Sequence, residues 1–458
     1  MRITKNLTEG NVYKNYLLYA LPLIASSILS SLYSTIDAVI AGKFISEHAL
    51  GAISATGSFD ILFQSFFNGF ASGFSVYIAQ QFGKGKFAAI KRNVINMVLF
   101  IAMISVLVSV SAIAFRTPIM EYLKIDGALW KDAEIYFIIY TAGYAFTFVN
   151  MILLRSLYAL GSTSFSIFAS MASACINIGG NLLAVLVFDM GVAGLAVSTL
   201  FSIFSTTVAY TVMLAKAFKE LGCEKEPYRF SFKCIKSSLS YTIPAAIQKL
   251  SFHATGFFIA PAINGLGPDA TTGYAVMNRM YNICAQSFWN MCSAVDCHTA
   301  QASGEGNAKK MRRGLFAGLW MNVAALSPFV LVFVFLAKPL ASIFFPSGYA
   351  GLALTYAVRF FEVYAIFLYI NMIGHLMHSY MRSIGCVRTV LWVTLFGSAV
   401  KVIATLLLVP HFHMDGVYIG QVLSWTADGA LSVLLYFALC HTQRHLQKII
   451  HKIQKRGA

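Results

Sequence analysis

The chain contains the same short motif twice. Residues 79–92 and residues 300–313, offset by 221 positions, each read Ala-Gln-x-x-Gly-x-Gly at the end of an apolar segment and then become basic. The same offset, or one of 222, relates Leu21-Pro22 to Ile243-Pro244, Gly51 to Gly273, Asn150 to Asn371, and Gly194 to Gly416. A duplication of this length predicts a fold built from two copies of one unit.

The composition places both copies in a membrane. Hydrophobic residues make up 58% of the chain and charged residues 11%, and the mean hydropathy is +0.70. A helix needs about 20 apolar residues to cross the hydrocarbon core. Twelve segments meet this requirement, near residues 15–41, 53–80, 94–115, 134–160, 163–188, 190–217, 238–262, 269–299, 315–337, 354–382, 386–410 and 414–440. We therefore expect an all-α membrane protein with twelve transmembrane helices.

The charge pattern predicts the orientation. A net charge of +16 would suit a nucleic-acid partner, but the basic residues are spread over short loops. Most of them lie in the N-terminus, the even-numbered connections and the C-terminus, which is the positive-inside pattern. We expect a multi-pass protein of the inner or plasma membrane, with both termini cytoplasmic and no nucleic-acid partner.

The repeat also predicts the domain boundaries. Residues 1–14 form a cytoplasmic N-terminus, 15–217 an N-lobe, 218–237 a charged cytoplasmic linker, 238–440 a C-lobe, and 441–458 a basic tail suited to anionic lipid. Six helices are an even number, so the two copies run parallel, and substrate is expected between them near the membrane midplane.

Two prolines occupy equivalent positions in the first and seventh spans. Pro22 and Pro244 each remove one backbone hydrogen bond, so each helix can bend there. A bend repeated in both lobes favours a hinge in a moving part, whereas the alternative is that each proline only shapes packing.

Several local patterns together resemble one known family. They are the parallel twelve-span duplication, the Ala-Gln-x-x-Gly-x-Gly ends, the spacing from Pro22 to Asp37, Ile176-Asn-Ile, and Asn278-Arg. Over about residues 12–440 the chain resembles the multidrug and toxic compound extrusion (MATE) transporters. Within that family it is more similar to the archaeal and DNA-damage-inducible branch than to the NorM branch, since Phe252 stands where NorM-type proteins tend to have Glu.

The resemblance implies a function. It implies a V-shaped pair of six-helix lobes around a central cavity. Such a protein exports amphipathic, often cationic compounds in exchange for inward protons or sodium, by alternating access. The coupling ion would be H⁺ or Na⁺, with no other cofactor, no resident metal and no enzymatic activity, and we expect a monomer in contact with membrane lipids.

The resemblance also implies a cation-coupling site in the N-lobe. Asp37, fifteen residues after Pro22, matches the family's span-one Asp, although on sequence alone it could be an interfacial residue; the second copy has Ile259 there. The other matching positions are Asn177, Asn181, Thr199, and Tyr136 or Tyr140. Position 181 is Asn rather than the usual Asp, and Asn cannot titrate. A single-proton site and a sodium site with neutral ligands both remain open, and coupling by two carboxylates is in doubt.

Other polar residues inside spans are candidates for the substrate cavity, because such residues are expensive there. Asp60, Gln64 and Asn68 share a face of the second span, where they could line the cavity mouth or pack. Asp428, halfway along the twelfth span, could pair with Lys401 or Arg279, bind a cationic substrate, or take part in coupling. The candidates are Asp60, Gln64, Asn68, Gln248, Arg279 and Asp428.

Two other function classes compete. A lipid-linked oligosaccharide flippase of the same superfamily would use basic cavity residues, for which Lys249, Arg279 and Lys401 are available. A membrane-embedded enzyme would need a nucleophile and base, a metal cluster or a cofactor loop, and the sequence contains no P-loop and no His-Glu-x-x-His. His375 and His378 lack a third ligand nearby in sequence, so no metal site is predicted.

Overall fold

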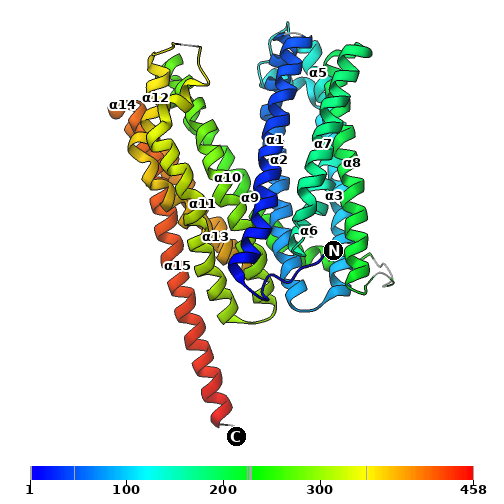
Figure 1. The fold of residues 1–458 in the computed structure, drawn as a ribbon, viewed down its shortest axis with the longest axis vertical. Helices are drawn as coiled ribbons and strands as arrows, with labels where there is room; N and C mark the ends of the chain where they lie inside the picture. The colour runs from blue at the N-terminus through cyan, green and yellow to red at the C-terminus, as the bar shows by residue number, and fades with distance from the viewer. Residues whose placement is uncertain (1–2, 46, 224, 226–229, 347, 457–458) are drawn as a thin grey trace. The chain divides into compact units, whose positions relative to one another are not determined.

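A computed structural model describes residues 3–45, 47–223, 225, 230–346 and 348–456 (Figure 1). These residues are almost entirely helical and contain no strand. The elements are α1 (Val12–Ile40), η1 (Ala41–Ile45), α2 (Glu47–Gly83), α3 (Phe87–Ala114), α4 (Arg116–Tyr122), α5 (Trp130–Ala142), α6 (Tyr144–Ala159), α7 (Ser164–Leu182), η2 (Leu183–Val187), α8 (Gly191–Glu220), α9 (Phe232–Asn264), α10 (Pro268–Gly304), α11 (Ala308–Ser342), α12 (Leu352–Tyr364), η3 (Ala365–Phe367), α13 (Leu368–Ser383), α14 (Val387–Phe412) and α15 (Met414–Arg456).

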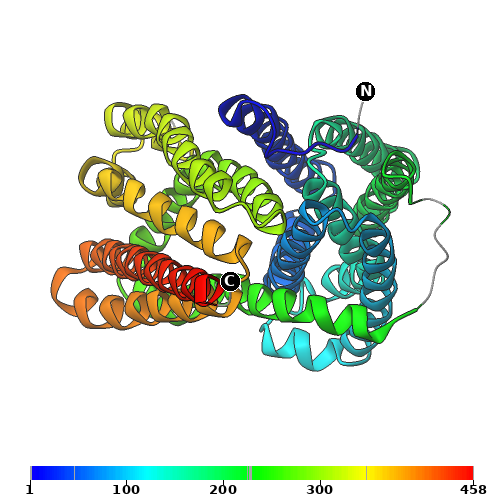
Figure 2. The ribbon, with the colours of Figure 1, turned by 90° about the horizontal axis from the view of Figure 1, so that it is seen from below.

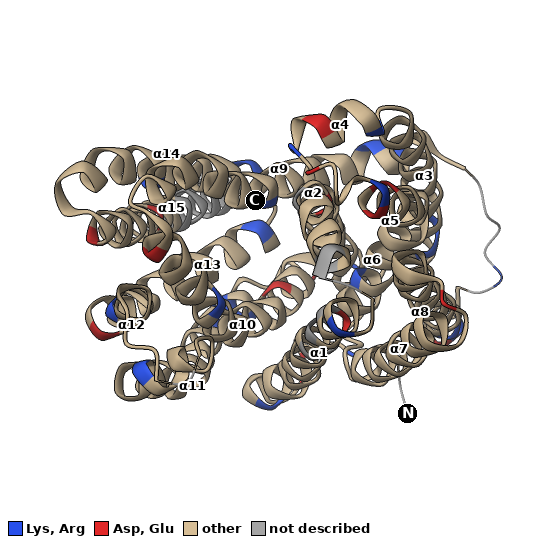
Figure 3. Ribbon diagram, turned by 90° about the horizontal axis from the view of Figure 1, so that it is seen from above, with Lys and Arg blue, Asp and Glu red and all other residues tan. Residues whose placement is uncertain are grey.

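Each of the twelve predicted spans lies in one helix or in two or three consecutive helical segments, so the all-α prediction is confirmed. Six uninterrupted stretches within the described residues are long and apolar enough to cross a membrane on their own. A seventh is the pair α5 and α6, bent by 46° at Gly143. A Cβ at Gly143 would lie 2.0 Å from Leu200 Cδ2, so a larger residue at this break would require the Leu200 side chain of α8 to move. In Figure 3 most of the ribbon carries no charged residue, as expected of spans in hydrocarbon.

The chain forms two compact units. Unit 1 contains Met1–Leu250 and Cys297–Gly314, and unit 2 contains Ser251–Asp296 and Leu315–Ala458. Of the predicted linker, residues 224 and 226–229 lie outside the described residues, as do the side chains of the predicted tail, 441–458. The predicted lobe boundaries stay a prediction.

The duplicated motif brings α2 and α10 together within unit 1. A Cβ at Gly83 would lie 2.0 Å from the Gln301 carbonyl oxygen, and a Cβ at Gly304 would lie 2.2 Å from that of Gln80. Each copy therefore supplies the glycine against which the other copy's glutamine backbone packs. The motif recurs because one crossing of two helices requires it from both sides. We call this end of unit 1, predicted to be cytoplasmic, the inner end.

Helix α2 also packs closely against the first half of α9. A Cβ at Gly69 would lie 2.5 Å from the Ala245 carbonyl oxygen, and one at Gly73 would lie 2.5 Å from that of Tyr241. Small residues four apart let transmembrane helices approach to backbone contact. Glycines along one helix thus hold α2 against both α9 and α10.

The N-terminal segment is tied to the inner end by hydrogen bonds. The Ile3 and Thr4 amides donate to Glu220 Oε2 at 2.8 and 3.1 Å, and the Leu7 amide donates to Gln301 Oε1 at 2.8 Å. Thr8 Oγ1 donates to Glu305 Oε1 at 2.6 Å. Residues 3–8 thereby connect the ends of α8 and α10.

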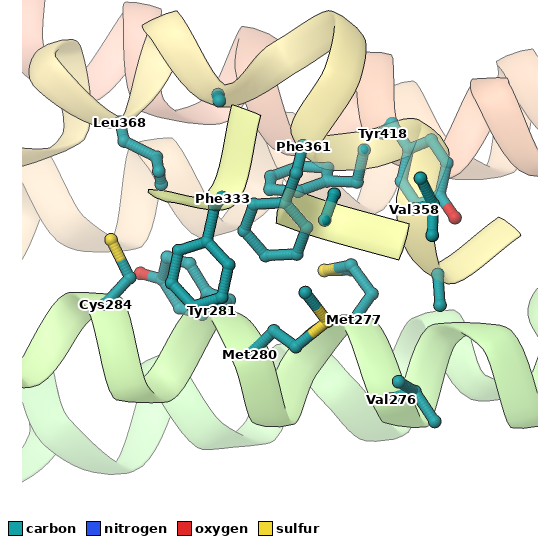
Figure 4. Close-up of a cluster of buried hydrophobic side chains, with 14 of the residues drawn as sticks. Val276, Met277, Met280, Tyr281, Cys284, Phe333, Val358, Phe361, Leu368 and Tyr418 are labelled. Carbon is teal, nitrogen blue, oxygen red and sulfur yellow. The ribbon is translucent and has the colours of Figure 1, made fainter. Parts of the chain in front are cut away.

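Unit 2 is organised around an apolar core (Figure 4). Met277, Met280 and Tyr281 of α10 meet Phe333 of α11 and Phe361 of α12 in one buried cluster. Figures 1 and 2 show α14 and α15 side by side as a hairpin that covers this unit.

We expect Gly304→Ala to destabilise the protein, because the added methyl group would collide with the Gln80 carbonyl. Overpacking of this kind costs about 1–3 kcal/mol and should lower the midpoint of thermal unfolding in detergent. Gly57→Ala is the matched control, since a Cβ at Gly57 on α2 would meet nothing within 4 Å. Equal midpoints for the two variants would contradict the close crossing of α2 and α10.

Glu305, in the loop after α10, should give the inner end an acid-sensitive contact. Burial raises its pKa, but hydrogen bonds from Lys310, Thr8 and Asn6 and the Lys310 charge together hold that pKa below its ordinary value of 4.5. The ionised form is thus favoured on folding, and its stabilisation is present above pH 4.5 and is lost as the pH falls through the lowered pKa.

The corresponding prediction concerns Glu305→Gln. At pH 7 we expect faster amide hydrogen exchange at residues 3–8 and a stability loss of at most about 1 kcal/mol. On acidification the wild-type protein should lose this increment and the variant should not. Identical exchange in the two proteins at pH 7 would show that the Glu305 contacts do not hold the segment.

Candidate cation site

Asp37 and two asparagines meet near one end of unit 1. Asp37 lies on α1, one turn before the helix passes into the π-helical segment η1. Asn177 and Asn181, one turn apart on α7, are 1% and 0% exposed. Asn181 Nδ2 donates to Asp37 Oδ1 at 2.7 Å. Positions 144 residues apart in sequence are thus joined where the resemblance placed them.

Asn177 links Asp37 to Thr199 on α8. In one amide orientation, Asn177 Nδ2 donates to Thr199 Oγ1 at 3.2 Å and the amide oxygen faces Asp37. In the reversed orientation the amide donates to Asp37 Oδ1 at 2.6 Å and accepts from Thr199 Oγ1 at 3.2 Å. Amide orientations are assigned from such networks. An ionised Asp37 favours the reversed orientation, whereas a proton or cation between the two oxygens favours the first.

The cluster is rich in oxygen and poor in compensating charge. Asp37 contributes two oxygens, Thr199 its hydroxyl, and each asparagine its amide oxygen. Asn181 Oδ1 is buried and has no donor among the described residues. Within this same part of the chain, no Lys or Arg lies at ion-pair distance from Asp37. The arrangement can hold a proton on the carboxyl group or bind a hard cation through oxygen ligands.

A second polar group lies on α2 and α5. Gln64 Nε2 donates to Asp60 Oδ2 at 2.5 Å and to Tyr140 Oη at 3.2 Å. Tyr136 stacks on Tyr140, with ring centroids 5.5 Å apart. Tyr136 also lies within electrostatic range of both Asp60 and Asp37. Of the two tyrosines that the resemblance offered as alternatives, Tyr140 lies beside the Asp60 group and Tyr136 stacks on Tyr140, and the choice between them stays a prediction.

The other candidates lie apart from this cluster or remain without an assigned role. Asn68 Oδ1 accepts from Arg155 Nη2 at 3.2 Å, and Gln248 is half-buried on α9. Arg279 is exposed on α10 in unit 2. Helices α1 and α9 run without interruption through Pro22 and Pro244, and Ser26 Oγ donates to the Pro22 carbonyl at 2.7 Å.

Asp428 has a partner that sequence reasoning missed. Its Oδ1 lies 3.3 Å from Nε2 of His378 on α13, and the two side chains are 19% and 6% exposed. A Cβ at Gly374 would lie 2.9 Å from Asp428 Oδ2, and one at Gly397 would lie 3.0 Å from Asp428 Cβ. Those glycines make room for the acid and are the sequence signal for this contact, whereas the sequence pattern offers His378 only as half of a metal pair.

Comparisons with known proteins agree with this fold. The MatE family model matches residues 22–183 and again residues 244–407. Over 98% of both chains the protein is 22% identical to the probable multidrug resistance protein YoeA of Bacillus subtilis (strain 168). It is 20% identical to the multidrug export protein MepA of Staphylococcus aureus (strain MRSA252), over 63% of this chain and 64% of that protein.

Solved structures show the same architecture. One described as the outward-facing conformation of a multidrug resistance MATE family transporter of the MOP superfamily has a TM-score of 0.87 at 17% identity. The match covers 97% of this chain and 100% of that one. At this identity the likeness shows the fold, while the family follows from the model that matches both halves of the sequence. The chain is a multi-pass membrane protein that belongs to the MATE family of transporters.

Proposed function

We propose that this protein is a multidrug exporter driven by inward movement of protons or sodium. The observation that carries the proposal is the single acid of the α1–α7–α8 cluster, Asp37, which is met by the amides of Asn181 and Asn177 rather than by a basic residue. Relatives named for multidrug resistance and multidrug export support the direction and substrate class. The substrate would be an amphipathic, often cationic, small molecule.

The hydrogen bonds suggest how ion binding could move α1. An ionised Asp37 needs donors, which Asn181 and the reversed Asn177 amide supply. A protonated Asp37 must instead donate, so at least one asparagine has to present its oxygen. Loading the site thus rearranges the contact between α1 and α7. Pro22, which lacks an amide hydrogen, offers α1 a place to bend in response, and Pro244 offers the same to α9.

The aromatic residues beside Asp60 fit the proposed substrate class. Phe59 packs against Phe63 and Phe137, with ring centroids 4.8 and 5.4 Å apart. Flat cations are attracted to such rings. Protons or sodium ions that move inward down their gradient would then be exchanged for a cation bound near these side chains, by alternating access.

The remaining features of the proposal follow from the sequence. The lobes would be residues 15–217 and 238–440, the termini would face the cytoplasm, and the protein would act as a monomer in the inner or plasma membrane. Besides its small-molecule substrate, we expect membrane lipids as its partner.

The first test is transport by proteoliposomes with Asp37→Asn. Asparagine keeps the shape but cannot carry charge, so we expect uptake of an ethidium-like cation driven by an ion gradient to fall at least about tenfold. Separate proton and sodium gradients applied to the wild-type protein identify the coupling ion.

Asp132→Asn is the matched control, because Asp132 lies in the first turn of α5, outside the cluster. It should transport like the wild type. If Asp37→Asn folds normally and keeps full gradient-driven activity, Asp37 is not the coupling residue. If neither gradient drives cation transport in the wild type, the exporter proposal fails.

A further inference from the structure

Asp60 is a buried acid that the site described above does not explain. It lies on α2, four residues before Gln64, whose amide donates to its Oδ2. Its other oxygen, Oδ1, is fully buried, and among the described residues no donor reaches it in good hydrogen-bond geometry, although the Tyr144 hydroxyl lies close to the carboxyl group. A carboxylate that keeps its charge needs partners for both oxygens. Asp60 as it stands has an amide for one oxygen only.

The basic residues that approach α2 do so elsewhere. Arg155 donates to Asn68, and the Lys249 side chain lies against Gly69, two turns or more along α2 from Asp60. Lys43 of η1 is exposed. The titratable groups that face Asp60 from α5 and α6 are tyrosines, which are neutral donors and acceptors. Within the described residues, no Lys or Arg reaches ion-pair distance of this acid.

The position of Asp60 relative to the break between α5 and α6 is a second, independent observation. Tyr140 precedes Gly143 by three residues and reaches Asp60 through Gln64. Tyr144 follows Gly143 directly and lies against Asp60. Asp60 thus faces both sides of a span bent by 46°. Interrupted helices are where membrane transporters place their ion sites.

The two acids of unit 1 lie near the same pair of tyrosines. From Asp60 the connection runs through Gln64 to Tyr140, and then to Tyr136, which stacks on Tyr140 and is in electrostatic range of both acids. Asp37 keeps its own amide donor, Asn181. Each acid therefore has at least one amide donor of its own, and Tyr136 lies near both acids.

We propose that Asp60 is a second proton-carrying carboxylate, which gives this protein two acids in its coupling unit although position 181 is Asn. A proton suits Asp60 better than sodium, because only one of its oxygens is free and a sodium ion would require several more oxygen ligands at that point. The step is a simple transfer, in which Asp60 gains a proton from water on one side of the membrane and releases it on the other. The inference rests on the proposed exporter function.

The test counts protons. Purified protein in detergent, in weak buffer with a pH indicator, receives a saturating ethidium-like cation, and the protons released per bound cation are measured. We expect two for the wild type, one for Asp60→Asn, one for Asp37→Asn, and none for the double variant. Asp60→Glu, which restores a carboxyl group, should return the count toward two. Thermal unfolding confirms that each variant is folded.

The outcomes separate the two proposals. If Asp60→Asn releases as many protons as the wild type while Asp37→Asn releases fewer, Asp60 is no proton carrier and the exporter proposal stands. If Asp60→Asn fails to fold, Asp60→Glu decides. If Asp60 carries a proton, the variant should release protons with a changed pH dependence. If Asp60 is only structural, the variant should fold and the pH dependence of proton release should stay that of the wild type. If cation binding releases no proton from the wild type, Asp60 is overturned as a carrier, and the sodium gradient test of Asp37 decides the fate of the exporter proposal.

Discussion

The cost of a charge in hydrocarbon decides what each acid of this protein can do. Placing one Asp at the centre of a spanning helix costs about 3 kcal/mol on insertion scales. In unit 2, Asp296 binds the basic Arg382 at 2.7 Å, and Asp428 lies beside the imidazole of His378. Asp37 and Asp60 in unit 1 are met by the amides of Asn181 and Gln64 instead. A neutral shell leaves their charge free to change, which is why we propose ion coupling in unit 1.

The two copies share the backbone packing of the repeated motif but differ in their polar side chains. The glycines and glutamines of the repeated motif still serve the same crossing of α2 and α10. By contrast Ile259, which stands where the first copy has Asp37, is fully buried in the apolar core of unit 2. Asn150 donates to Thr206 and Thr207, whereas its counterpart Asn371 donates to Tyr281. Backbone packing constrains both copies equally, whereas the ion site that we propose uses Asp37 of the first copy.

Hydropathy predicted the helices because each span must satisfy its own backbone hydrogen bonds. The resemblance predicted that Asp37, Asn177, Asn181 and Thr199 would meet, and the structure brings them together. Contacts between distant side chains gave no such signal. Tyr140 is 76 residues from Gln64, and Arg359 pairs with Asp415 56 residues away, so helix spacing rules cannot find either contact. The break at Gly143 lay inside one predicted span, because hydropathy does not register a bend.

The asparagine at position 181 is compatible with the proposal of two acids in unit 1, because it avoids a second carboxylate directly beside Asp37. A carboxylate there would face Asp37 at hydrogen-bond distance, and two like charges so close cannot both ionise, so their protonation would be strongly coupled. An amide donates to Asp37 instead. With the second acid on α2, held by Gln64, each carboxyl group has its own donor and the tyrosines separate the two. With Asp60 as the second carrier that we propose, two protons would bind and leave with less mutual interference than in a directly paired site.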